Sequence, residues 1–122
     1  MPSHPFTKTQ RVRRRSEFQQ IFKNGYRVGS RYFTLLLSPN AGSPTRLGIV
    51  ASRKLGDAVH RNRAKRLIRE LFRLNDTSAT GIDVVVIPRR ELFDAAYSEL
   101  DRDFRTAWRR GSSRMVSTVD VR

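Results

Sequence analysis

The apolar positions of this chain follow different periods in different segments, and each period predicts a type of secondary structure. Over residues 53–73 they recur every three or four residues, the spacing of a helix with one buried face. Residues 82–87 are almost all apolar and β-branched, which is typical of a strand buried on both faces. Further helices are expected at 17–24 and 90–110, and further strands at 26–28, 31–38 and 46–52. This order of elements predicts an α+β domain in which helices cover one sheet.

Turn and capping residues mark where these elements begin and end. Ser16, with Gln19 three residues later, has the spacing of a capping box that opens the first helix, and Gly25 is expected to end it. Residues 1–14 and 111–122 fall outside every element, and we expect a flexible basic arm and a flexible tail there. The 122 residues suffice for one hydrophobic core but not for two, so 1–122 is expected to form a single domain.

The helix predicted at 53–73 has two faces of opposite chemistry. At about 100° per residue, one face carries Ala64, Leu67, Ile68, Leu71 and Phe72, and the other carries Asn62, Lys65, Arg66, Arg69 and Arg73. Like charges at these spacings repel by a few tenths of a kcal/mol per pair, a cost that a bound polyanion would remove. A solvated charged surface is the simpler explanation, but only Glu70 offsets the helix cations from within. The pattern therefore favours a surface that binds nucleic acid.

The overall charge indicates the same class of partner. The chain has 25 Lys and Arg against 11 Asp and Glu, a formal net charge of +14, and such a charge attracts polyanions through counterion release. A membrane fits less well, because no basic amphipathic segment stands apart from the core and no stretch approaches the roughly 20 apolar residues of a membrane span. The absence of cysteines excludes disulfides and cysteine zinc sites and fits a reducing compartment.

Groups that could catalyse hydrolysis are sparse in this sequence. The two histidines are His4, in the expected arm, and His60, which projects toward the apolar side of its helix and is expected to have a structural role. The densest acidic group lies on the last predicted helix among arginines, which favours ion pairs over a metal site; it comprises Glu91, Asp94, Glu99, Asp101 and Asp103. We therefore expect no catalytic and no metal-binding residues in the protein, and an autonomous metal-dependent nuclease is the weakest hypothesis.

Aromatic side chains offer a second mode of RNA binding. Phe18, Ile21 and Phe22 share one face of the first predicted helix, and the strand that follows carries Tyr32 and Phe33. Aromatic rings beside a basic surface can stack on unpaired bases, at about 1 to 3 kcal/mol per base. From spacing alone, however, the favoured explanation is that these rings anchor a short helix to the sheet.

Several motifs resemble those of the bacterial ribonuclease P protein family. The main match is a run that comprises Arg53-Lys54, Gly56, Ala58-Val59, Arg61-Asn62-Arg63, Lys65-Arg66 and Arg69-Glu70. The segment from Arg11 to Gly25 resembles the opening helix of the family, and Arg46-Leu47-Gly48 resembles the strand before the main motif. The resemblance covers about residues 8–108, in order and with compatible gaps.

The resemblance implies both a fold and a function. The fold is a two-layer α/β sandwich of order α-β-β-β-α-β-α with a left-handed βαβ crossover, an exception to the usual right hand. The chain is expected to be the protein subunit of a bacterial, cytoplasmic ribonucleoprotein endonuclease that removes the 5′ leader of precursor tRNA. Its partners would be a catalytic RNA and precursor tRNA, with no obligate protein partner. Mg²⁺ would be held mainly by the RNA, which carries catalysis.

The resemblance also assigns roles to residues of this chain. The surface for the catalytic RNA would comprise Arg53, Lys54, Arg61, Asn62, Arg63, Lys65, Arg66 and Arg69, and the leader cleft would comprise Phe18, Phe22, Tyr32 and Phe33. Where many relatives have an aromatic residue this chain has Leu36, so the aromatic part of the cleft is either smaller or comes from Tyr32 or Phe33. A general RNA-binding or ribosome-associated protein stays the alternative, because the charge and the basic helix would suit it equally.

Overall fold

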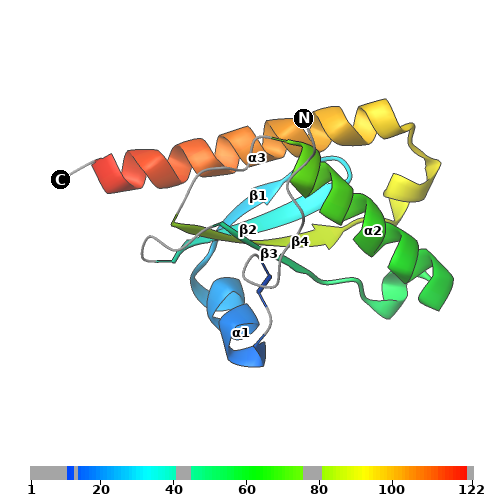
Figure 1. Ribbon diagram of the computed structural model, residues 1–122, viewed down its shortest axis with the longest axis horizontal. Helices are drawn as coiled ribbons and strands as arrows, with labels where there is room; N and C mark the ends of the chain where they lie inside the picture. Colours follow the sequence, from blue (N-terminus) through cyan, green and yellow to red (C-terminus); the bar gives the residue numbers. More distant parts are fainter. Residues whose placement is uncertain (1–10, 13, 41–44, 76–80, 121–122) are drawn as a thin grey trace.

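A computed structural model describes residues 11, 12, 14–40, 45–75 and 81–120 of the chain. Its main elements are α1 (Arg15–Asn24), β1 (Tyr26–Gly29), β2 (Phe33–Pro39), β3 (Arg46–Ile49), α2 (Ala58–Leu74), β4 (Ile82–Pro88) and α3 (Tyr97–Asp120). Two short 3-10 helices, η2 (Arg53–Leu55) and η3 (Arg90–Asp94), precede α2 and α3 (Figure 1). The order of helices and strands is the predicted one. Residues 1–10 of the expected arm lie outside the described residues.

The four strands form one mixed sheet in the order β1-β2-β4-β3. β2 pairs antiparallel with both β1 and β4, whereas β3 and β4 are parallel. Neighbouring parallel strands need a crossover connection, and α2 supplies it here, which confirms the expected β-α-β unit. The left hand of that crossover stays an expectation from the resemblance.

The face of the sheet that carries α2 and α3 holds the larger core. The apolar sides of both helices pack against alternate strand residues, including Phe33, Leu35, Val84 and Val86. Phe33 meets Phe104 of α3 edge to face, with ring centroids 5.8 Å apart. The apolar side of α3 is buried against this face, and its buried residues are Leu100, Phe104, Ala107 and Trp108. This packing places a layer of helices on one face of the sheet, as expected for an α/β sandwich.

α1 lies on the opposite face of the sheet and covers part of it (Figure 1). A smaller core cluster there comprises Val12, Ile21, Leu36 and Val85, with Phe18, Val50 and Ile87 partly buried around it. β4 therefore contributes to both cores, which confirms the prediction of a strand buried on both faces. Because α1 has only 10 residues, part of this face remains available for a groove beside it.

The basic helix starts later than residue 53. Gly56 has φ +126°, a conformation that glycine adopts without steric cost, and it separates η2 from α2. Asp57 then caps α2, because its carboxylate accepts a hydrogen bond of 3.0 Å from the backbone N–H of His60. Arg53 and Lys54 consequently lie on η2 rather than on the helix.

The last helix also differs from its prediction. It begins at Tyr97 and continues to Asp120, so the prediction of a flexible tail is wrong for residues 111–120. Tertiary packing explains the extension. Gly111 is buried so close to Leu37 that an added Cβ would lie 2.6 Å from its Cδ1, and the Arg114 guanidinium lies 5.1 Å from the centre of the Tyr26 ring.

The start of α1 is fixed by Glu17 and not by the predicted capping box. The Glu17 Oε1 accepts a hydrogen bond of 3.2 Å from the backbone N–H of Arg14, and the helix begins at Arg15. Val12, which was expected in the flexible arm, is buried and donates its N–H to the Leu47 carbonyl at 2.9 Å. The arm prediction is therefore wrong at Val12, because this apolar side chain joins the core cluster of Ile21.

Candidate nucleic-acid interface

α2 presents its cations on two flanks rather than along one ridge. Its buried face comprises Ala64, Ile68, Leu71 and Phe72, as predicted. On one flank Lys65 and Arg69 line a groove that also includes Phe18 of α1. On the other flank Arg63 and Arg66 line a separate pocket beside η3 and α3. One helix thus carries most of the predicted basic set, and four of its members line two separate concave surfaces.

The first of these surfaces, which we call the α1–α2 groove, measures about 320 Å³. Its floor is β3, through Leu47, Gly48 and Ile49, and Arg11 and Val12 border it. Phe18 lies directly over β3, since a Cβ added at Gly48 would be 2.8 Å from the Phe18 Cε1. The groove therefore joins an aromatic ring and cationic side chains over one strand.

A network of ion pairs fixes α1 against the sheet beside this groove. Arg46 of β3 donates to both Asp83 carboxylate oxygens, at 2.9 and 2.7 Å, and to Glu17 Oε2 of α1 at 2.9 Å. These bonds, first of all those to Asp83, raise the pKa of Arg46. Because Asp83 is only 6% exposed, the network is partly shielded from water and holds the helix that carries Phe18 in place.

The aromatic residues predicted to line the cleft have different positions. Phe18 is partly buried and Phe22, one turn later on α1, is 47% exposed. Tyr32 and Phe33 belong to the core on the α2 and α3 face, where Phe33 is completely buried. The structure contradicts their placement in the cleft. The alternation of β2 could have shown this for Phe33, since it shares a strand face with Leu35 and Leu37.

Leu36 lies on the opposite strand face from Phe33, and this is the face that carries α1. It is 3% exposed and belongs to the cluster of Ile21 and Val85. A buried leucine at this position supports α1 but offers no ring to a base. Among the predicted aromatic residues, Phe18 and Phe22 are consequently the two on the α1 side of the sheet.

The remaining predicted RNA-binding residues lie on η2 and at the start of α2. Asn62 is exposed on the helix, and Arg61 is partly exposed one turn before Lys65. Arg53 and Lys54 are exposed on η2, on the N-terminal side of Gly56. The structure keeps all of these side chains accessible to a large ligand.

His60 has a structural position at the N terminus of α2. Its Nδ1 lies 2.7 Å from Asp57 Oδ1, and its ring meets the Phe93 ring edge to face at 5.2 Å between centroids. The hydrogen bonds from the His60 backbone and ring lower the pKa of Asp57. The side chain is 52% exposed and therefore half-buried, and its contacts fit the structural role that was expected.

The acidic residues of the last helix stabilise the fold. Asp101 pairs with Arg105 one turn later, and Glu99 accepts a hydrogen bond from the Ala96 N–H at 3.2 Å. Asp103 accepts hydrogen bonds from the Ser30 hydroxyl at 2.7 Å and the Tyr32 N–H at 2.9 Å. Among the described residues no three histidines or acids form a group that could hold a metal ion. In that same part of the chain, no helix is long and apolar enough to span a membrane.

Two residues that shape the groove were not predicted as site residues. Arg11 borders it from the segment that was expected to be flexible. Gly48 provides the space for the Phe18 ring. A glycine inside a strand is a signal for close approach of another group, so Gly48 could have been identified from the sequence.

Comparisons with known proteins agree with this architecture. A family model described as ribonuclease P matches residues 6–112. The ribonuclease P protein component of Thermotoga maritima is 46% identical over 88 residues, which are 71% of this chain and 75% of that protein. The solved RNase P protein from T. maritima superposes with a TM-score of 0.70 at 38% identity, covering 77% of this chain and 90% of that one. The solved Staphylococcus aureus RNase P protein superposes with a TM-score of 0.74 at 33% identity, covering 84% of this chain and 94% of that one. The chain belongs to the ribonuclease P protein family.

Proposed function

We propose that this protein binds the RNA subunit of ribonuclease P through α2 and guides the 5′ leader of precursor tRNA along the α1–α2 groove. The observation that carries the proposal is the groove itself, in which Phe18 lies over Gly48 and faces the flank of Lys65 and Arg69. Family membership makes the chain a protein component of ribonuclease P, and thereby a subunit of an endoribonuclease of tRNA processing. Which surface binds the RNA subunit and which binds the leader is our inference.

The surface for the RNA subunit consists of the exposed cations at the start of α2 and on η2. Arginine forks bind phosphate oxygens through two parallel hydrogen bonds, and Asn62 adds a donor and an acceptor among them. The predicted members are Arg53, Lys54, Arg61, Asn62, Arg63, Lys65, Arg66 and Arg69. Because Lys65 and Arg69 line the groove as well, they are also in position to hold the leader backbone.

The leader and the groove are chemically complementary, because a single strand offers bases and phosphates and the groove offers an aromatic ring and cations. Unpaired bases of a single strand stack on aromatic rings, while its phosphates interact with cations. Phe18 provides a ring inside the groove and Phe22 an exposed ring one turn along α1. Mature tRNA lacks the leader, so this groove would discriminate substrate from product.

The chemical step is assigned to the RNA subunit with its Mg²⁺ ions. In this protein the one described histidine hydrogen-bonds to Asp57, the residue that caps α2, and the acids of α3 hold backbone and arginine groups. These side chains are committed to the fold rather than to proton transfer. The protein contributes positioning and charge neutralisation, which lowers the Mg²⁺ concentration that the RNA needs. The holoenzyme would act in the bacterial cytoplasm, where precursor tRNA is made.

Reconstitution tests this proposal. The purified protein should leave precursor tRNA intact, and it should restore 5′ cleavage at limiting Mg²⁺ when a bacterial ribonuclease P RNA is added. Cleavage by nuclease-free protein alone would contradict the assignment of chemistry to the RNA. Tight RNA binding without any stimulation of cleavage would favour the alternative, a general RNA-binding or ribosome-associated protein.

A further inference from the structure

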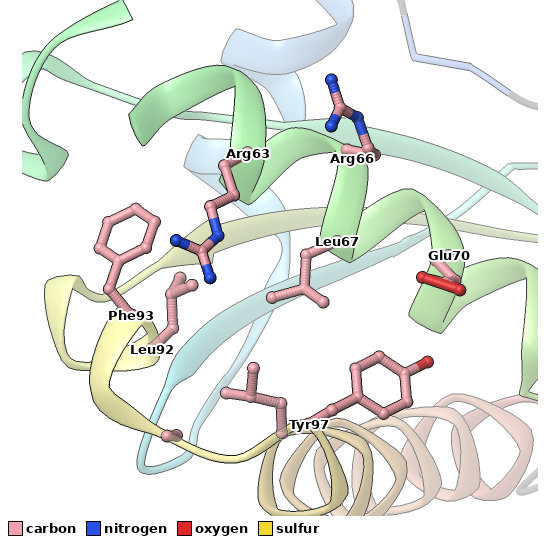
Figure 2. A pocket seen from close by; sticks show the side chains of 9 residues that line it. Arg63, Arg66, Leu67, Glu70, Leu92, Phe93 and Tyr97 are labelled. Atoms are coloured by element: carbon pink, nitrogen blue, oxygen red, sulfur yellow. The ribbon is translucent and has the colours of Figure 1, made fainter. Parts of the chain in front are cut away.

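A second concave surface lies on the other flank of α2, which we call the α2–η3 pocket. It measures about 330 Å³ and is formed by α2, η3 and the first turns of α3 (Figure 2). This volume falls within the range of small-ligand sites, about 300 to 1,000 Å³. Its lining includes Arg63, Arg66, Leu67, Glu70, Phe93 and Tyr97. The α1–α2 groove does not share any of them.

The pocket combines an apolar floor with aromatic rings. Leu92 and Leu100 are buried beneath it, at 2% and 3% exposure. Figure 2 shows Phe93 and Tyr97 at opposite ends, with Leu67 between them. Tyr97 is 42% exposed, so much of its ring remains uncovered. A planar ligand could stack there and remove apolar surface from water.

Two arginines at the rim indicate that the ligand is anionic. Arg63 extends toward Phe93 and Leu92, whereas the Arg66 guanidinium points away from the floor (Figure 2). No salt bridge engages either side chain within the described part of the chain. Arg63 is consequently available for a phosphate group at the mouth of the pocket, and Arg66 adds positive charge beside it.

Glu70 makes the pocket unsuitable for a simple anion. Its carboxylate lines the same space as the two arginines, and among the described residues it has no salt bridge. Burial, and then the charge of Glu70, raise the pKa of Tyr97. A ligand that fits must therefore bring hydrogen-bond donors to Glu70 as well as negative charge to the arginines.

We propose that the α2–η3 pocket binds one unpaired guanine nucleotide of the RNA partner, with the base at Tyr97, its Watson–Crick edge on Glu70 and its phosphate on Arg63 and Arg66. This rests on the proposed function, since the partner RNA supplies the nucleotide. Guanine presents two adjacent donors, N1–H and the N2 amino group, to both carboxylate oxygens. Adenine, cytosine and uracil each place an acceptor next to their donor, which the carboxylate would repel. Unpaired bases of RNA are commonly read in this way, by stacking and edge contacts together.

The direct test is an NMR titration of the isotopically labelled full-length chain with guanosine 5′-monophosphate, adenosine 5′-monophosphate and inorganic phosphate. The guanine nucleotide should shift resonances of Leu67, Phe93 and Tyr97 and should bind about tenfold more tightly than the adenine nucleotide. Glu70→Gln should abolish that preference. Glu91→Gln, at an exposed acid of η3 outside the pocket lining, should leave it intact.

In the holoenzyme, the same two variants distinguish loss of the guanine contact from a change of charge, because the two effects shift RNA affinity in opposite directions. Glu70→Gln removes a negative charge from the basic helix, so charge alone would tighten its binding to ribonuclease P RNA. The proposal expects weaker binding, by about tenfold if the guanine contact is lost, whereas Glu91→Gln should not weaken it. Circular dichroism of each variant confirms that the helices are intact.

Several outcomes would overturn the inference. Equal binding of the two nucleotides, identical shifts with inorganic phosphate, shifts confined to the α1–α2 groove, or no shifts would each do so. If guanine selectivity is absent while the wild-type protein still restores precursor cleavage, only this inference fails. If selectivity is present while cleavage is not restored, the proposed function fails and the nucleotide site stands.

Discussion

The Phe18 ring lies so close to the backbone of Gly48 that a Cβ at this glycine would be 2.8 Å from the ring. α1 and β3 can approach in this way only because residue 48 has no side chain. The contact sets the depth at which the ring lies in the groove. Residue 48 therefore controls the position of the aromatic wall.

We predict that Gly48→Ala displaces Phe18 and impairs leader binding. A methyl group at this distance forces the ring or α1 to move, and such overpacking costs about 1 to 3 kcal/mol of unfolding free energy. Urea denaturation measures that cost, and precursor tRNA binding to the reconstituted holoenzyme measures the loss of affinity.

Gly29→Ala is the matched control for this substitution. Gly29 also lies in a strand, and the nearest group that an added Cβ would meet there is an Arg89 Nη2 at 3.6 Å, an ordinary contact distance. Gly29→Ala should therefore leave leader binding unchanged. If Gly48→Ala behaves like Gly29→Ala in both assays, Phe18 does not depend on the glycine.

The ion pair between Arg46 and Asp83 should stabilise the fold strongly. Arg46→Met would leave a carboxylate that is 6% exposed without its cation, at a cost of about 3 to 5 kcal/mol. The double variant with Asp83→Asn removes both charges and should regain part of that stability. Thermal and urea unfolding of the single and double variants measure the coupling free energy between Arg46 and Asp83. Equal stability of Arg46→Met and the wild type would refute a structural role for the pair.

The cations of α2 should determine how RNA binding depends on salt. Each lost phosphate contact lowers the slope of log affinity against log salt concentration by about 0.7 to 0.9. Arg66→Ala with Arg69→Ala should therefore weaken assembly with the RNA subunit and flatten its salt dependence, with little change in thermal stability. Arg109→Ala, at an exposed arginine of α3, is the control. An unchanged slope for the double variant would show that these side chains do not bind phosphates.

The Asp57 cap should make stability depend on pH in the acidic range. Its hydrogen bonds with His60 hold the pKa of Asp57 below the ordinary value of 3.8. For a carboxylate with a lowered pKa, the contribution to stability is fully present above the unfolded value and is lost as the pH falls through the folded value.

Asp57→Asn keeps a capping side chain that does not titrate, so it serves as the comparison. The difference in melting temperature between wild type and Asp57→Asn should narrow as the pH falls below about 4. A constant difference across that range would mean that the Asp57 charge does not contribute to the cap.

Periodicity was sufficient to predict the order of elements and the two faces of α2. The buried side of that helix and the double-sided burial of β4 follow directly from residue spacing. The extension of α3 could not be predicted in the same way. Residues near Gly111 have no strong helical pattern, and they are ordered by contacts with Leu37, which is far away in sequence.

The candidate site was predictable in its chemistry and not in its geometry. Sequence spacing identified the cations of α2 but not their division between two flanks, which depends on what packs on each side. Tyr32 and Phe33 were misplaced because both strand faces are apolar here, so aromatic character does not tell which face is covered. Strand alternation with Leu35 would have separated Phe33 from Leu36.

The central claim is that aromatic rings on α1 bind the leader. Phe18→Leu and Phe22→Leu keep much of the apolar volume and remove the ring, and each should weaken leader binding by about 1 to 3 kcal/mol. Phe33→Leu is the control, because Phe33 is buried on the other face. It should lower the melting temperature without changing substrate selectivity.

The most direct measurement is the ratio of precursor to mature tRNA affinity for holoenzyme made with each of these variants. The account predicts that the ratio falls about fivefold or more for Phe18→Leu and Phe22→Leu, while mature tRNA binding stays nearly constant and Phe33→Leu keeps the wild-type ratio. Equal weakening toward both tRNAs, or an unchanged ratio in the α1 variants, would contradict it and leave Phe18 and Phe22 as anchors of α1.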